Sequence, residues 1–195
     1  DQLLRKGDAD GAMPYLRAAV RLDPKDAVAR NNLGLVLAEK GDPDGALAAY
    51  REAIRLDPAF GPAHCNLGSA LQQRGDLDGA IAACREAVRL DPKLAEAHLS
   101  LGAALLGKGD VDGAITALRE AIRLDPKNAT AHLSLGAALL EKGDVDGAIV
   151  ACREAIRLDP KDATAHLSLG DALMEKRDVD GAVTAYRQAI RLDPN

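Results

Sequence analysis

Hydrophobic positions in residues 95–128 form two helical stripes, which a polar, glycine-rich stretch separates. The first stripe follows the spacing i, i+3, i+4, i+7, at His98, Leu101, Gly102 and Leu105. The second has the same intervals, at Ala114, Ala117, Leu118, Ala121 and Ile122. These intervals are those of one face of an α-helix. The pattern therefore predicts two amphipathic helices in this segment.

The stretch between the stripes contains residues suited to end one helix and begin the next. Gly109 favours the left-handed conformation that terminates a helix. Asp110 or Asp112 is suited to cap the start of the second helix. That helix should end at Leu124-Asp-Pro, because the residue before a proline is pushed away from helical angles. Residues 95–128 are thus predicted to form two antiparallel helices joined by a short turn.

This pattern recurs along the chain every 34 residues. The tripeptide Leu-Asp-Pro begins at Leu22, Leu56, Leu90, Leu124, Leu158 and Leu192. Units that start at Ala27 span 27–60, 61–94, 95–128, 129–162 and 163–195, and a partial unit, 1–26, precedes them. No insertion or deletion interrupts the register. The sequence therefore predicts an all-α solenoid of helical repeats.

Two local features depart from ideal helices. Glycine recurs within the predicted first helices, at Gly34, Gly68, Gly102, Gly136 and Gly170. Glycine costs about 1 kcal/mol relative to alanine there, so we expect the close approach of a neighbouring helix to compensate. Pro14 falls early in a predicted second helix, where we expect a late start or a distorted first turn.

The unit resembles the tetratricopeptide repeat (TPR), a 34-residue helix–turn–helix. In 27–60 the residues that match the family pattern are Leu33, Gly34, Leu37, Ala46, Tyr50, Ala53 and Pro58. The resemblance implies a single domain over residues 1–195, wound as a right-handed superhelix with a concave peptide groove. The chain departs from the family at the frequent Trp position, which holds Arg30, His64, His98, His132 and His166. It also departs at an aromatic slot of the second helix, which holds Cys84, Leu118 and Cys152.

A second apolar stripe on the later first helices is the candidate binding surface. In TPR proteins the corresponding positions line the concave groove. The candidate groove residues are Leu99, Ala103, Leu106, Leu133, Ala137, Leu140, Leu167, Asp171 and Met174. We expect this stripe to face solvent and to bind a peptide or helix with apolar anchors. Leu and Ala at these positions do not favour the basic carboxylate clamp of the chaperone-adaptor class.

Charge narrows the partner classes. The chain has 25 Lys and Arg against 30 Asp and Glu, for a formal net charge of −5. This balance argues against nucleic acid or an anionic membrane as the partner, because both are bound through an excess of basic groups. Two arginine rows along the second helices are interleaved with glutamates, so we interpret them as a solvated outer face.

The sequence gives little support for a catalytic or metal-binding site. The four histidines lie one repeat apart, about 8–10 Å between packed helices, which is too far for a shared zinc ion. Cys84 and Cys152 lie on the buried stripe of the second helix, whereas Cys65 is expected to be reachable. No nucleophile elbow or phosphate loop is present in the sequence. We therefore expect no catalytic residue, no metal and no cofactor.

The function expected from the sequence is a protein-interaction scaffold that is a piece of a larger, cytoplasmic protein. The alternative is a structural module that self-associates weakly, head to tail. In that alternative the C-terminal helix of one copy meets the partial first unit, 1–26, of another, because a solenoid end leaves apolar surface uncovered.

Overall fold

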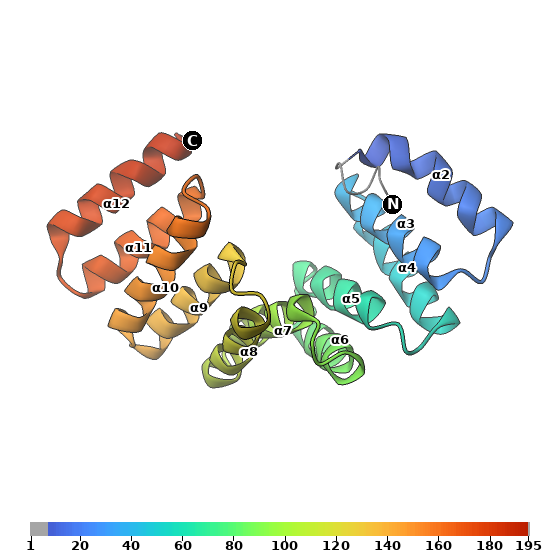
Figure 1. The fold of residues 1–195 in the computed structure, drawn as a ribbon, viewed down its shortest axis with the longest axis horizontal. Helices are drawn as coiled ribbons and strands as arrows, with labels where there is room; N and C mark the ends of the chain where they lie inside the picture. The colour runs from blue at the N-terminus through green and yellow to red at the C-terminus, as the bar shows by residue number, and fades with distance from the viewer. Residues whose placement is uncertain (1–7, 195) are drawn as a thin grey trace. The chain divides into compact units, whose positions relative to one another are not determined.

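The computed structural model describes residues 8–194, in which α-helices are the regular elements and no strand occurs (Figure 1). Every complete repeat has two helices. The first helices are α3 (Ala27–Glu39), α5 (Gly61–Gln73), α7 (Ala95–Gly107), α9 (Ala129–Lys142) and α11 (Ala163–Glu175). The second helices are α2 (Ala9–Leu22), α4 (Pro43–Leu56), α6 (Leu77–Leu90), α8 (Val111–Leu124), α10 (Val145–Leu158) and α12 (Val179–Leu192). The predicted all-α repeat fold is confirmed.

The chain divides into two compact units, Asp1–Lys93 and Leu94–Asn195. In the first unit α3 packs on α4 and α5 on α6, while α2 contacts α3 and α4 contacts α5. In the second unit α7, α9 and α11 pack on α8, α10 and α12, while α8 contacts α9 and α10 contacts α11. Neighbouring repeats within a unit are thus joined through a second helix and the first helix that follows it. That residues 1–195 form one domain stays a prediction.

An aspartate caps every described second helix. The caps are Asp8, Asp42, Asp76, Asp110, Asp144 and Asp178. Each carboxylate accepts a hydrogen bond from the backbone N–H of the glycine three residues later, at 2.8–3.0 Å. Of the two candidate caps in 95–128, Asp110 is the one used. Gly109 has a φ of 82°, which confirms the predicted left-handed stop, and Arg177 has a φ of 65° at the equivalent position of the last repeat.

The two helices of a repeat approach most closely at the glycine of the first helix. A methyl group on Gly102 would lie 2.6 Å from Cγ of Leu118, and one on Gly136 would lie 2.7 Å from Sγ of Cys152. The other pairs are Gly34 with Tyr50, Gly68 with Cys84 and Gly170 with Tyr186. Side-chain carbons cannot lie so close without displacing their neighbours. The expected compensation for glycine is confirmed: it leaves room for a side chain of the second helix.

Pro14 lies inside α2 and does not delay its start. The helix begins at Ala9, directly after its cap, in the same register as the other second helices. The expectation of a late start is therefore wrong. The preceding turn is held by Asp8, whose carboxylate accepts from the N–H of Gly11 and whose carbonyl accepts from the N–H of Ala12. Pro14 removes only the N–H that would otherwise bond to the carbonyl of Asp10.

The substitution Gly136→Leu should lower the free energy of unfolding by roughly 1–3 kcal/mol, because the new side chain overlaps Cys152. Urea unfolding followed by circular dichroism measures the change. The matched control is Ala137→Leu, which adds a larger side chain at the next position, where residue 137 is exposed. Equal stability of the two variants would contradict the packing of α9 on α10.

Candidate protein-binding surface

The predicted binding stripe lies on three first helices of the unit Leu94–Asn195. Helix α7 carries Leu99, Ala103 and Leu106; α9 carries Leu133, Ala137 and Leu140; and α11 carries Leu167, Asp171 and Met174. Helix α9 contacts both α7 and α11. The nine residues therefore occupy equivalent positions on three successive, touching helices. We refer to them as the first-helix groove.

Exposure along this groove rises from α7 to α11. Leu99 is only 9% exposed and belongs to the core, contrary to the expectation that the whole stripe faces solvent. Leu133 is half-buried, and Leu167 and Met174 are 45% and 46% exposed. The gradient follows the packing order, because α9 packs beside α7 whereas, in the described part of the chain, no first helix follows α11.

A hollow of about 300 Å³ lies between α9 and α11. It is lined by Gly136, Ala137, Leu140, Glu141, Ser168 and Asp171. Three of these were predicted from the apolar stripe, namely Ala137, Leu140 and Asp171. Glu141 and Ser168 were not, because each lies one position beyond the apolar spacing. The hollow therefore joins apolar surface to two carboxylates.

Asp171 is fixed in place by Tyr186 of α12. The Tyr186 O–H donates to Oδ1 of Asp171 at 2.7 Å. This hydrogen bond, with smaller effects of burial and of the carboxylate charge, raises the pKa of Tyr186 above its ordinary value. The bond leaves the second carboxylate oxygen of Asp171 available to a ligand. The phenol thus positions an acidic group at the α11 side of the hollow.

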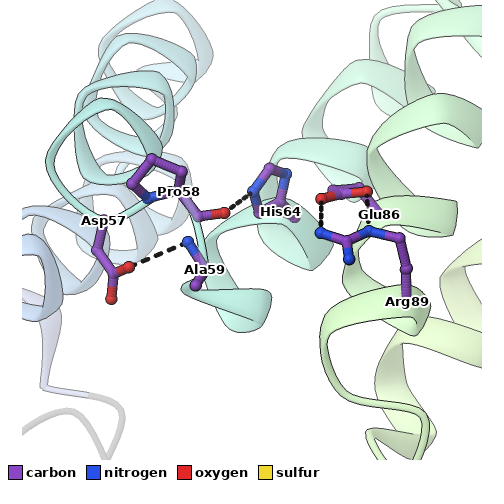
Figure 2. Close-up of polar contacts among 6 residues, drawn as sticks. All are labelled: Asp57, Pro58, Ala59, His64, Glu86 and Arg89. Carbon is purple, nitrogen blue, oxygen red and sulfur yellow. Dashed lines mark hydrogen bonds and ion pairs between the residues drawn. The ribbon is translucent and has the colours of Figure 1, made fainter.

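Three of the histidines at the Trp-like position contact the loop that precedes their own helix. Figure 2 shows the His64 ring directed at the carbonyl of Pro58, with 3.0 Å between Nε2 and the oxygen. The equivalent contacts are His132 with Pro126 at 3.1 Å and His166 with Pro160 at 3.4 Å. In the same loop the Asp57 carboxylate accepts from the N–H of Ala59 at 3.0 Å. The imidazoles thus have a local structural role.

The arginine rows are partly paired, as the interleaved glutamates predict. Glu86 and Arg89 form a two-pronged ion pair, at 2.8 and 2.6 Å, which lowers the pKa of Glu86 (Figure 2). A second set of ion pairs joins neighbouring repeats, between an aspartate in the first turn of a second helix and a base 30 residues later. These pairs are Asp10–Lys40, Asp44–Arg74, Asp112–Lys142 and Asp146–Lys176. Sequence reasoning missed them, although their constant spacing was visible.

Comparisons with known proteins agree with this architecture. Residues 4–195 match the family model described as the cilia and flagella-associated protein 70 C-terminal domain, a TPR model. The chain belongs to the tetratricopeptide repeat family. A crystal structure of MamA is similar, with 32% sequence identity, a TM-score of 0.72, and coverage of 83% of this chain and 95% of MamA. No protein of curated function matches the sequence significantly.

Two further TPR structures share the fold at lower identity. The first is YrrB, described as "a TPR protein with an unusual peptide-binding site", which has 22% identity and a TM-score of 0.70. It covers 92% of this chain, and the match covers 93% of YrrB. The second is PilF of Pseudomonas aeruginosa, which has 22% identity and a TM-score of 0.84, with coverage of 100% of this chain and 88% of PilF.

The three cysteines of this TPR chain are all buried. Burial raises the pKa of the Cys84 thiol to about 12 and that of Cys152 to about 11. Cys65 is 2% exposed, so the expectation that it is reachable is wrong. Cys65 occupies in α5 the position that Leu99 occupies in α7, and Leu99 is buried as well. A thiol that stays protonated and enclosed is a poor nucleophile.

Residues 8–194 contain no cluster of three or more His, Cys, Asp or Glu side chains that could hold a metal ion. In the same residues no helix has the length and apolar character needed to cross a membrane.

The buried thiols predict slow labelling of the native protein. At pH 8, Cys65, Cys84 and Cys152 should react with Ellman's reagent far more slowly in buffer than in concentrated urea, where all three should react. The variant Ala137→Cys supplies an exposed thiol as the positive control. Fast labelling of an original thiol under native conditions would contradict the packing described above.

The same thiols predict a loss of stability at high pH. The unfolded chain releases these protons near pH 9, whereas the folded chain holds those of Cys84 and Cys152 until about pH 12 and 11. Their contribution to the free energy of unfolding is therefore complete below pH 9 and declines as the pH rises through that interval. The decline should be smaller in Cys84→Ala, measured by urea unfolding at pH 8 and pH 10.

Proposed function

We propose that this chain is a protein-interaction module, and not an enzyme, that binds a peptide or helix in the first-helix groove. The observation that carries the proposal is the hollow between α9 and α11, together with Leu167 and Met174, which are exposed on the same stripe of α11 as its lining residue Asp171. Exposed large apolar side chains that flank a hollow provide the anchor sites that a partner's Leu-like residues can fill. The peptide-binding site described for YrrB is consistent with this use of the fold.

The charge of the hollow indicates which side chains the partner should carry. Glu141 and Asp171 both line it, and Tyr186 holds Asp171 in position. A partner that buries apolar anchors here meets carboxylates at the same place. We therefore propose a segment that carries one or two Leu-like anchors next to a Lys or Arg side chain. A compartment does not follow from this site, so a cytoplasmic location remains a prediction.

The groove can be tested with peptides selected from a random dodecapeptide library on the immobilised protein. Leu167→Glu should weaken binding of the selected peptides about tenfold or more, because it places a charge where an apolar anchor docks. The expected change is measured by fluorescence anisotropy. Leu133→Glu should have the same effect, with a larger loss of stability, because Leu133 is half-buried.

The matched control is Val150→Glu, which changes a 67% exposed apolar residue on α10 that lies outside the first-helix groove, in a separate hollow between α8 and α10. Its affinity for the selected peptides should equal that of the original chain. If Val150→Glu and Leu167→Glu weakened binding equally, or if Leu167→Glu had no effect, the groove proposal would be wrong.

A second candidate function, head-to-tail self-association, is favoured by one observation. Helix α12 exposes Val179, Val183 and Ile190 at 55%, 40% and 62%, whereas Ile149 of α10, the counterpart of Val183, is 5% exposed. Ala185, which was also expected to be uncovered, is buried. The partner surface proposed at the other end includes residues 1–7, which lie outside the described residues.

Self-association predicts that light scattering gives a rising average mass over a hundredfold range of protein concentration. The variant Ile190→Glu should abolish the rise, because it charges the most exposed apolar position of α12. A constant monomer mass for the original chain would rule out this function and would leave the peptide-binding proposal intact.

A further inference from the structure

A second, larger hollow lies between the second helices α10 and α12 and is also lined by α11. Its volume is about 760 Å³, within the range of known ligand sites. Ile156 of α10 and Leu169 and Leu173 of α11 provide its apolar surface. None of the nine residues of the first-helix groove lines it. We refer to this site as the α10–α12 groove.

One repeat earlier, α8 and α10 form an equivalent hollow of about 470 Å³. Three of its apolar residues, Ile122, Leu135 and Leu139, lie 34 positions before those of the α10–α12 groove, and Val150 and Ala151 line it as well. The α10–α12 groove has four charged lining residues, Asp178, Asp180, Arg187 and Arg191, whose counterparts do not line the earlier hollow. Among the positions that line both sites, the charge changes at one. The earlier hollow has Glu154, and the α10–α12 groove has Gln188. The α8–α10 hollow therefore serves as an internal comparison for the α10–α12 groove.

The change from glutamate to glutamine releases an arginine. In the complete repeats before the last, a glutamate pairs with the arginine three residues later. These pairs are Glu52–Arg55, Glu86–Arg89, Glu120–Arg123 and Glu154–Arg157. In α12 the neutral amide of Gln188 precedes Arg191, and no carboxylate among residues 8–194 pairs with this arginine. Arg191 lines the α10–α12 groove instead.

Two more arginines line the same groove, Arg153 on α10 and Arg187 on α12. Arg187 and Arg191 are four residues apart, so their side chains lie on one side of α12. All three arginines are exposed, and no carboxylate in the described part of the chain pairs with any of them. The guanidinium groups are therefore available to an anionic partner, and each can bind a carboxylate through two parallel hydrogen bonds.

The acidic residues of the groove lie at its other end. Asp178 caps α12 and accepts the N–H of Gly181 at 3.0 Å, and Asp180 lies in the first turn. Along a helix that rises about 1.5 Å per residue, Asp180 and Arg191 are separated by roughly 16 Å. The groove is thus acidic where α12 begins and basic where it ends, with apolar side chains among its lining residues.

We propose that the α10–α12 groove binds an acidic peptide segment. An apolar side chain of the segment packs on Ile156, Leu169 and Leu173, and its carboxylates pair with Arg187 and Arg191. An extended nucleic acid is a poorer match, because it would meet the Asp178 end of the groove and a chain whose net charge is −5. The proposal is independent of the first-helix groove, whose hollow is acidic.

The probe is a fluorescein-labelled peptide of alternating Leu-Glu pairs, with a Leu-Lys peptide of the same length as its charge control. The acidic peptide should bind, with an affinity that falls as the salt concentration rises, and the basic peptide should not bind this groove. Gln188→Glu supplies Arg191 with an internal partner and should weaken binding of the acidic peptide about tenfold. Arg191→Ala should do the same.

Two variants serve as controls for the site. Leu167→Glu alters only the first-helix groove and should leave affinity for the acidic peptide unchanged. Glu154→Gln frees Arg157, three residues beyond the lining of the α8–α10 hollow, and should add a second, weaker binding site for the acidic peptide. Circular dichroism should show equal helicity in all variants, since these residues lie on the surface.

Three results would overturn the proposal. The first is that the acidic peptide does not bind. The second is that the basic peptide binds as tightly as the acidic peptide and that Gln188→Glu weakens the binding of both. The third is an affinity that Leu167→Glu lowers while Gln188→Glu and Arg191→Ala do not, because the peptide would then occupy the first-helix groove. Only this last result would bear on the function proposed above, so the two failures are distinguishable.

Discussion

The contact between a glycine and one side chain of the partner helix governs the structure of each repeat. Gly136 has no side chain where Cys152 needs the space, and Gly102 makes the same room for Leu118. Because the helices approach closely there, alanines elsewhere in the repeat can fill the remaining interface. The core accordingly consists largely of Ala, with few large side chains. A chain with 2% aromatic residues can therefore form a closely packed α-helical protein.

Packing against neighbours limits what the sequence alone could predict. Helical spacing, the aspartate caps and the 34-residue register are local signals, and they were sufficient for the fold. Exposure is not local, because it depends on the next repeat. Leu99 and Cys65 occupy the same helix position as Leu167, yet they are buried and Leu167 is exposed. The Pro14 expectation failed for a local reason: the Asp8 cap and the register of α2 outweigh the loss of one hydrogen bond.

Predicting the candidate sites required both the local sequence pattern and the packing between repeats. The apolar stripe on α9 and α11 was visible in the sequence, but the carboxylates beside it were not, because Glu141 and Asp171 come together only across two repeats. Of the arginines of the α10–α12 groove, Arg153 belongs to a row that was interpreted as a solvated face, and Arg187 and Arg191 continue the two rows into α12. Only Gln188 distinguishes Arg191 from the earlier members of its row, and its effect appears when Arg191 is compared with the paired Arg157.

The glycine contact also leaves the choice of helix partner unspecified. A glycine accommodates Tyr50, Cys84, Leu118 and Cys152 in turn, so it does not discriminate among the second helices of the chain. The tight turns do, since α9 ends at Lys142 and α10 begins at Val145. Connectivity therefore places the correct partner next to each first helix. Lengthening such a turn would permit a first helix to pair with the same second helix of another copy of the chain. This exchange is the event that begins a domain swap.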